Sequence, residues 1–385
     1  MMAVGKVDGR RDSSRKANFF DLLRLIAAAM VIVGHAWSLS GVRPVPALAG
    51  ISVHHLGVYI FFTVSGFLLA RSWSRDSRPL LFLLRRCLRI FPALVLVVLF
   101  TVLVLGPLAT TNSQPEYWGS ADTWRYLLNA VLIAQYELPG VFTDNPSLAV
   151  NGSLWSLGPE FFCYVMLVAL GFLNPKFRFA LRVLIALVVG AVSIIVPIPS
   201  GLKIVAIAVV FFLVGSLLAS VRMPARLPLA PGIVGLCLLV PLDDEIGLVA
   251  AWITVPYLII SVGSRTGGLA QRIRRLGDPS YGMYLWAFPI QQLVIAESGN
   301  PPLWASIGIV LAIATLIGYG SWHFIEKPAV KLGTVASGRS GDSQIRQRRS
   351  AAVGVPRSGD NHRHSIEGVP STNDRIPDLP HSPEA

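Results

Sequence analysis

The chain has 385 residues, of which 53% are hydrophobic and only 14% are charged, against roughly 25% charged residues in an ordinary soluble domain. This composition excludes an ordinary soluble globular protein. The net charge of +12 does not indicate nucleic-acid binding, because many basic residues lie in short loops between apolar segments, where they set membrane orientation. The three cysteines (Cys87, Cys163 and Cys237) form no C-x-x-C pair and predict neither a metal site nor a disulfide framework.

Apolar segments long enough to cross a bilayer follow one another along the chain. Crossing the ~30 Å hydrocarbon layer takes about 20 residues of helix, and lipid offers the backbone no hydrogen-bond partner, so only helices or closed barrels can span it. These segments are continuous and rich in Leu, Ala and Val, which predicts helices. We expect ten spans, at about 19–40, 51–71, 89–108, 153–173, 179–197, 202–221, 229–241, 246–263, 279–296 and 302–325.

The charges of the loops predict the orientation of these spans. Basic residues gather in alternate loops, such as 71–89, 176–182 and 265–275, whereas the opposite loops are mostly acidic. By the positive-inside rule, both termini are then cytoplasmic. We therefore predict an all-α polytopic bundle of about ten spans, with a basic N-terminal segment at 1–18, a transmembrane domain at 19–330, and a polar tail at 331–385 whose composition favours disorder.

The first span carries three ionisable residues within its apolar run: Asp21, Arg24 and His35. At about 100° per residue, all three lie on one helix face. Asp21 and Arg24, three residues apart, are placed to pair near the cytoplasmic end, while His35 lies about 16 Å further along, at 1.5 Å per residue. Ionisable residues inside a membrane usually face a cavity and have a function there. We expect this face to line the functional site.

The second span contains His54, His55 and Ser65. No G-x-S-x-G motif surrounds Ser65, so a nucleophilic role is not indicated, and small residues such as Ser and Gly also allow close packing of transmembrane helices. The two histidines lie at the outer start of the span, where an interfacial position is the more ordinary interpretation.

Arginines precede the third span, at Arg85, Arg86 and Arg89. Orientation of the protein in the membrane accounts for some of these charges. Arg86 and Arg89, three residues apart, share a helix face that suits phosphate binding through charge-assisted hydrogen bonds.

The fourth span opens with Trp155, Pro159 and Glu160. Proline fits a first helical turn, which places Glu160 near the outer end of that helix. Two interpretations remain open there, a favourable interaction with the helix dipole and an acidic partner for His35. Before this span, the long outer loop at about 109–150 carries Trp118, Trp124, Tyr126 and Tyr136, aromatic residues that either stack on a sugar or anchor at the membrane interface.

These segments, in this order, resemble the acyltransferase-3 family of membrane acyltransferases over about 19–330. The resemblance rests on the Asp-Leu-Leu-Arg run that ends at His35, Phe-Phe-Thr-Val-Ser-Gly-Phe at 61–67, the Arg-x-x-Arg of 86–89, Ser-Leu-Trp-Ser-Leu at 153–157 with Glu160, Ser-Tyr-Gly-Met-Tyr-Leu-Trp at 280–286, and Glu-Lys-Pro at 326–328. Two positions depart from the family pattern: Ala287 stands where many members have His, and Gly158-Pro159 precede the Glu.

The resemblance implies transfer of an acyl group, usually acetyl, from cytoplasmic acyl-CoA to a hydroxyl of a carbohydrate. It implies that His35 is the catalytic base and that Arg24, Arg86 and Arg89 serve the donor. From the residues we add Glu160, which would orient the imidazole or the acceptor, and Arg85 as a further donor-binding residue. Asp21, Ser65, Trp155 and Glu326 complete the expected site as supporting residues.

A histidine is suited to remove a hydroxyl proton near neutral pH, and an acyl-histidine intermediate is an alternative route. We expect acyl-CoA as a co-substrate, no bound cofactor or metal, and a location in the plasma (inner) membrane. The acceptor is open among lipopolysaccharide O-antigen, exopolysaccharide, a macrolide and other glycosides. The rival hypothesis is a transporter or flippase of a glycan or lipid-linked sugar, whose buried charges would form a substrate or proton path.

Overall fold

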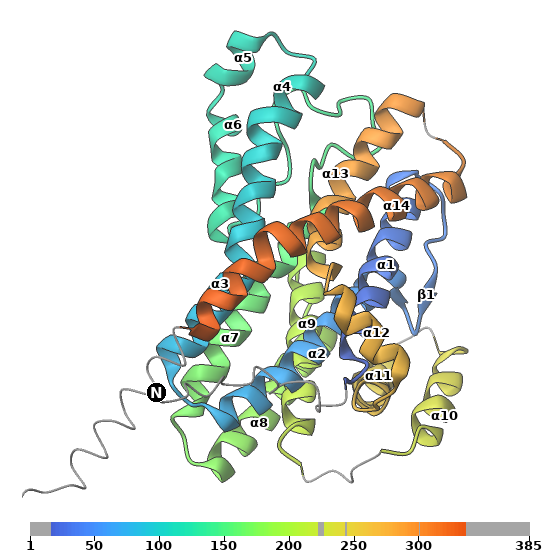
Figure 1. Cartoon of the computed structure of the whole chain (residues 1–385). Helices are drawn as coiled ribbons and strands as arrows, with labels where there is room; N and C mark the ends of the chain where they lie inside the picture. The colour runs from blue at the N-terminus through green and yellow to red at the C-terminus, as the bar shows by residue number, and fades with distance from the viewer. Residues whose placement is uncertain (1–16, 222–226, 243–244, 300, 336–385) are drawn as a thin grey trace, which may run out of the picture. The chain divides into compact units, whose positions relative to one another are not determined.

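The structure, a computed structural model, describes residues 17–221, 227–242, 245–299 and 301–335. The predicted segment 1–18 and the predicted tail 331–385 therefore lie almost wholly outside the described residues. Within the described ranges the chain is mostly helical, and its only strands form one two-stranded antiparallel hairpin, β1 (Ala47–Leu48) with β2 (Ile51–Ser52) (Figure 1). The predicted all-α class is confirmed.

The helices follow one another with short connections. In chain order they are α1 (Phe20–Leu39), α2 (Val53–Arg75), α3 (Pro79–Phe100), η1 (Thr101–Leu105), α4 (Gly106–Ala109), α5 (Gln114–Gly119), α6 (Ala121–Arg125), η2 (Tyr126–Val131), η3 (Gly152–Ser156), α7 (Leu157–Gly171), α8 (Pro175–Ile195), α9 (Ser200–Leu218), α10 (Ala230–Leu239), α11 (Glu245–Gly263), α12 (Gly268–Leu276), α13 (Ser280–Ser298), α14 (Leu303–Ser321) and η4 (Trp322–Glu326).

Each predicted span coincides with a helix, and eight helices in the described ranges are long and apolar enough to cross a membrane. The two others fall short for different reasons. α10 has ten residues, about half of what ~30 Å of hydrocarbon requires. α13 has 19 residues, and its C-terminal half carries the polar pair Gln291 and Gln292. The count of ten spans and the cytoplasmic position of both termini stay predictions.

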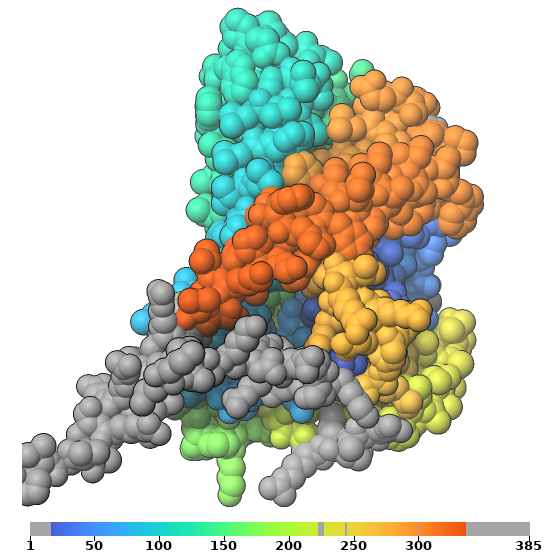
Figure 2. All heavy atoms as spheres, in the orientation of Figure 1, coloured from blue at the N-terminus to red at the C-terminus, as the bar shows by residue number. Residues whose placement is uncertain are grey.

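The third predicted span begins earlier than the sequence indicated. The helix starts at Pro79 and runs without a break to Ala109, because proline at a first helical position costs no hydrogen bond. The arginines at 85–89 therefore lie inside this helix rather than in a loop before it. In the same way, the last helix continues from α14 through η4 to Val335; its residues form one band across the face seen in Figure 2.

Glycines bring α2 and α9 into close contact. A Cβ atom on Gly66 would lie 2.1 Å from the carbonyl oxygen of Phe212, and one on Gly215 would lie 2.4 Å from that of Thr63. Larger residues at these two positions would force the helices apart, which agrees with the use of small residues at transmembrane helix contacts. The packing expected for the Ser-Gly pair of α2 is thus made by Gly66, which leaves Ser65 on another face.

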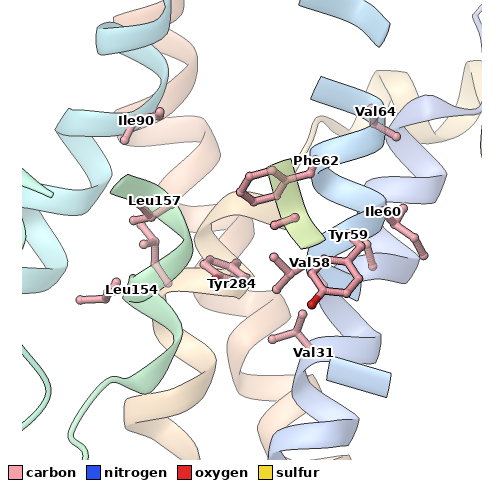
Figure 3. Packing of buried hydrophobic residues seen from close by; sticks show 14 of the residues in the cluster. Val31, Val58, Tyr59, Ile60, Phe62, Val64, Ile90, Leu154, Leu157 and Tyr284 are labelled. Atoms are coloured by element: carbon pink, nitrogen blue, oxygen red, sulfur yellow. The ribbon is translucent and has the colours of Figure 1, made fainter. Parts of the chain in front are cut away.

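The core lies between α1, α2, α7, α9 and α13. Val31 of α1, Val58 and Tyr59 of α2, Leu157 of α7 and Tyr284 of α13 belong to one buried hydrophobic cluster (Figure 3). This packing fixes α1 against α2 and α13, and α1 carries Asp21, Arg24 and His35.

Candidate functional site

The ionisable residues of α1 all face α13 and the loop before it. Arg24 pairs with Asp21, and its Nε atom donates to Asp278, two residues before α13, at 3.1 Å. Eleven residues further along α1, the ring of His35 packs edge-on against Phe288 of α13, with 5.0 Å between ring centroids. The predicted common face of the three residues is therefore present.

The arginines of α3 have different partners. Arg89 donates to Asp278 at 2.8 Å and also pairs with Glu326, while Arg85 donates to Asp76 at 2.6 Å. Arg86 lies near the ring of Phe82. Arg86 belongs to none of the ion pairs among the described residues, although Glu160 lies near enough to interact with its charge. The Nε atom of Arg86 is buried without a hydrogen bond. Arg89 is therefore held in place by acids, whereas Arg86 is available to an anionic ligand.

Asp278 joins the charges of α1 and α3, and the sequence interpretation missed it. Burial alone would raise the pKa of its carboxyl, but the guanidiniums of Arg24 and Arg89 and the hydrogen bonds from Ser280 outweigh burial and lower that pKa from 3.8 to about 2. The signal in the sequence was an Asp just before the apolar run of α13. Since it lies outside the predicted span, only tertiary contact reveals its partners.

A second acidic residue orders the start of α3. Asp76 accepts hydrogen bonds from Arg78 at 2.8 and 3.0 Å in addition to the one from Arg85. These bonds, first of all those from Arg78, hold the pKa of Asp76 well below its usual range. The ion pair of Asp76 and Arg85 thus fixes Arg85, the first of the three arginines at 85, 86 and 89, close to the loop that precedes α3.

Two cavities meet at these arginines. The mouth cavity, of about 320 Å3, is lined by five arginines with two acids and by apolar groups. The inner cavity, of about 200 Å3, is lined by residues of α1, α2, α3, η3, α7 and α13. Arg24, Arg86 and Arg89 line both cavities, so they form the boundary between a cationic entrance and an interior with fewer charged side chains.

Glu160 lies in the inner cavity, and the predicted pairing of Glu160 with His35 is not found among the described contacts. Its Oε1 atom accepts hydrogen bonds from Ser65 at 2.9 Å and from Tyr164. Glu160 lies in the first turn of α7, as the open interpretation of a helix-dipole interaction requires, and its carboxylate faces Ser65 of α2 rather than His35 of α1. The structure groups Glu160 with Ser65 and the arginines.

His35 belongs to a different group, the histidine cluster of His35, His54 and His55. The ring of His35 stacks on that of His54 at 5.1 Å, and His54 lies 4.2 Å from His55. Ser52 Oγ is 3.3 Å from His54 Nε2 and 2.8 Å from His55 Nδ1. His54 therefore contacts the predicted catalytic base directly, and His55 is joined to that base through His54. The sequence interpretation of both as ordinary interfacial residues did not foresee this.

The histidine cluster lies about one helical turn beyond the inner cavity. Val58 and Tyr284 line that cavity; His54 precedes Val58 by four residues on α2, and Phe288 follows Tyr284 by four residues on α13, about 6 Å in each helix. Trp155, predicted as a supporting residue, packs edge-on against His55 at 6.3 Å. Of the predicted supporting residues, Asp21 and Glu326 join the arginines, Ser65 joins Glu160, and Trp155 joins the histidines.

The long loop before η3 folds into α5, α6 and η2. Tyr126 is buried, whereas Trp124 and Tyr136 are 48% and 43% exposed. A polar cavity of about 490 Å3 between 120 and 148 includes Tyr136. In the described part of the chain, no group of three or more His, Cys, Asp or Glu residues could hold a metal ion.

The geometry offers two chemical environments along one bundle. A row of guanidiniums surrounds an entrance and suits a ligand with several phosphates. An imidazole lies about 16 Å from Arg24 along α1 and suits proton transfer. The inner cavity lies between them.

Comparisons with known proteins give one family and several relatives. The Acyltransferase domain family matches residues 17–322. Over 326 residues the chain is 31% identical to the O-acetyl transferase of Shigella phage Sf6, covering 81% of this chain and 96% of that protein. Over 172 residues it is 36% identical to Nodulation protein 10 of Rhizobium leguminosarum bv. viciae, covering 40% of this chain and 44% of that protein.

A third relative is longer than the chain. The peptidoglycan O-acetyltransferase OatA of Listeria monocytogenes is 25% identical over 355 residues, which cover 77% of this chain and 56% of that protein. No solved structure matches the chain.

Proposed function

The chain belongs to the acyltransferase-3 family and is a multi-pass membrane acyltransferase; from this premise we propose that it moves an acetyl group from cytoplasmic acyl-CoA to a hydroxyl of a carbohydrate or glycoside. Two of the relatives are named as O-acetyltransferases, and one of these acts on peptidoglycan. A transporter or flippase without acyl-transfer chemistry is not favoured by these relatives.

One observation carries the proposal for the donor: three arginines line both the cationic mouth cavity and the inner cavity. An acyl-CoA molecule is anionic at its phosphates and uncharged along the arm that ends in the thioester. Phosphates at the mouth would bind Arg85, Arg86 and Arg89 through charge-assisted hydrogen bonds. The arm would then pass Arg24 into the inner cavity, beside Glu160 and Ser65.

The reaction would take place at His35. His35 accepts the proton of the acceptor hydroxyl as its oxygen bonds to the thioester carbonyl carbon. The carbon–sulfur bond then breaks, and the same proton passes from the imidazole to the departing sulfur, so free CoA thiol and an acetyl ester result. Glu160 would act on the donor side of this scheme, where it holds Ser65 and Tyr164, instead of orienting the imidazole.

An acyl-histidine route remains an alternative, in which His35 first bonds to the acyl carbon and the acceptor then displaces it. Mixing the purified protein with labelled acetyl-CoA in the absence of an acceptor, followed by intact-protein mass spectrometry, separates the two routes. An added acetyl mass that is lost in a His35→Ala variant supports the intermediate.

We place the protein in the plasma (inner) membrane, with the mouth cavity facing the cytoplasm as the loop charges predict. The acceptor would be a surface polysaccharide, a macrolide or another glycoside presented at the histidine end. The decisive experiment is mass spectrometry of surface glycans from cells with and without the gene. Loss of an acetyl-sized mass increment would identify both the transferred group and the acceptor. Identical glycan spectra, together with no release of CoA thiol by the purified protein, would refute the proposal.

A further inference from the structure

A separate cavity opens beside the histidine cluster, at the end of the bundle away from the arginines. This outer cavity has a volume of about 340 Å3 and lies between the β1–β2 hairpin and the first turns of α9 and α11, against α2. The volume falls in the range of roughly 300–1,000 Å3 that is typical of small-molecule sites. Neither the donor path nor the reaction at His35 uses it.

The lining of the outer cavity combines apolar walls with a few polar groups. Ile204 and Leu248 contribute apolar surface, Lys203 and Glu245 bring opposite charges, and Tyr59 and His55 of α2 complete the lining. The Tyr59 hydroxyl donates to the carbonyl of Ile204 at 3.4 Å, which fixes the aromatic ring against α9. Apolar walls with a few hydrogen-bonding groups among them suit a hydroxylated ring.

A continuous set of contacts joins this cavity to His35. His55 lines the cavity and shares Ser52 with His54. The His54 ring in turn stacks on that of His35, and the Nδ1 atom of His54 is buried with no hydrogen-bond partner among the described residues. A polar ring atom left unpaired in a buried position is costly, so this nitrogen has capacity for a ligand hydroxyl or a water.

We propose that the outer cavity binds one sugar ring of the acceptor, that His55 contacts this ring, and that Ser52 and His54 are positioning residues that connect it with His35. The inference rests on the proposed function, which supplies a hydroxylated acceptor. It adds the place where that acceptor binds and the two histidines that present it. Donor and acceptor thus enter from opposite ends and meet at His35.

Kinetics of the purified full chain in nanodiscs test the proposal. The probes are labelled acetyl-CoA and a surface-glycan extract from cells that lack the gene. In His55→Gln, the half-saturating glycan concentration should rise about tenfold, the loss expected for one hydrogen bond of ordinary strength. The half-saturating acetyl-CoA concentration should stay unchanged, and His54→Gln should lower the maximal rate instead. Saturation of His55→Gln by glycan at wild-type concentrations would overturn the proposal.

Matched controls separate this effect from misfolding. His323 is exposed, and Tyr319, one turn earlier in the chain, provides the contacts that it makes among the described residues. His323→Gln should therefore keep both half-saturating concentrations. Lys203→Met and Glu245→Gln change the lining of the cavity without touching the histidines, and each should weaken glycan saturation in the same direction as His55→Gln. Glu297→Gln, an exposed acid on α13, is the control for Glu245.

A labelling experiment decides the proposal even if no acetyl transfer is detected. Lys203→Cys, in a chain whose exposed Cys237 is replaced by Ser, should react with a membrane-impermeant maleimide added outside intact cells. In purified protein, the glycan extract should protect this cysteine, and acetyl-CoA should not. If the wild-type protein has no transferase activity but glycan protects the Lys203→Cys variant from labelling, the reaction is refuted and the cavity proposal is retained. Absence of labelling, or labelling without protection, would refute the cavity.

Discussion

The mouth cavity and the histidine cluster lie along the same helix, α1, yet they are built from opposite kinds of contact. At the mouth, Arg24 and Arg89 are tied to Asp278, and Arg89 also to Glu326. At the histidine cluster, the ring of His35 contacts other rings, those of His54 and Phe288. Charge is matched by charge at one end, and side chains meet as stacked and edge-on rings at the other.

The difference follows from what each region must do before a ligand arrives. Guanidiniums taken out of water without partners would cost several kcal/mol each, so an empty cationic entrance needs acids to hold it together. An imidazole that is to accept a proton has no such need, and a carboxylate against it would favour the protonated form. Substitutions at the two ends should therefore have different effects. At the mouth cavity they should lower the stability of the folded protein, and at the histidine cluster they should lower the rate of acetyl transfer.

The largest effect is expected at the histidine end. His35→Ala removes the proton acceptor, and general base catalysis contributes roughly 100- to 10,000-fold in rate. Acetyl transfer, measured with labelled acetyl-CoA, should fall by at least about 100-fold, while the amount of protein in the membrane stays the same. The control His323→Ala should transfer at the wild-type rate. Wild-type transfer by His35→Ala would remove His35 from the mechanism.

Arg89→Ala should instead destabilise the folded structure around the mouth cavity. The substitution leaves Glu326, whose side chain is 1% exposed, and Asp278 without a shared guanidinium. Loss of one member of a buried ion pair costs about 3 kcal/mol or more. We expect a lower thermal unfolding temperature in detergent and less protein in the membrane, a failure that precedes any loss of rate. Unchanged thermal unfolding would show that the acids find other partners.

Arg86 differs from Arg89 because it takes part in no ion pair in the described structure. Arg86→Gln removes a guanidinium that makes no ion pair, so the thermal unfolding temperature should stay at the wild-type value or rise. The substitution should weaken acetyl-CoA binding by roughly 30-fold, as expected for a lost hydrogen bond to a charged group, ~2 kcal/mol. Isothermal titration with CoA provides the measurement. The opposite outcome, normal CoA affinity with lower stability, would make Arg86 structural like Arg89.

Sequence periodicity predicted the helices and the shared face of α1, because apolar blocks of about 20 residues and a 100° turn per residue are local properties. Sequence periodicity did not predict the side-chain partners that are set by tertiary packing. Glu160 was offered as an acidic partner for His35 from its place in one span, but its carboxylate accepts hydrogen bonds from Ser65 of α2 and from Tyr164. His54 and His55 were interpreted from their place in one span, and only the packing of α1 on α2 brings them to His35. Asp278 lay outside every predicted span, although it pairs with two arginines, Arg24 of α1 and Arg89 of α3.

The pH dependence of stability tests how much the mouth depends on Asp278. Its folded pKa of about 2 lies below the ordinary 3.8, so its contribution is fully present above pH 4 and is lost as the pH falls towards 2. Linkage gives a loss of about 1 kcal/mol by pH 3 and about 2 kcal/mol at the limit. Asp278→Asn should be less stable at neutral pH and should lack this part of the acid decline.

Thermal unfolding of both proteins in detergent between pH 5 and pH 3 makes the comparison. Carboxylates away from Asp278 titrate equally in the two proteins, so the difference between their slopes reports Asp278 together with the two acids that it influences, Asp21 and Glu326. Parallel slopes would mean that Asp278 is no more favourably placed in the folded chain than in the unfolded one. The guanidiniums of Arg24 and Arg89 would then need another source of compensation, and the contrast between a charge-paired entrance and a ring-packed catalytic end would lose its physical basis.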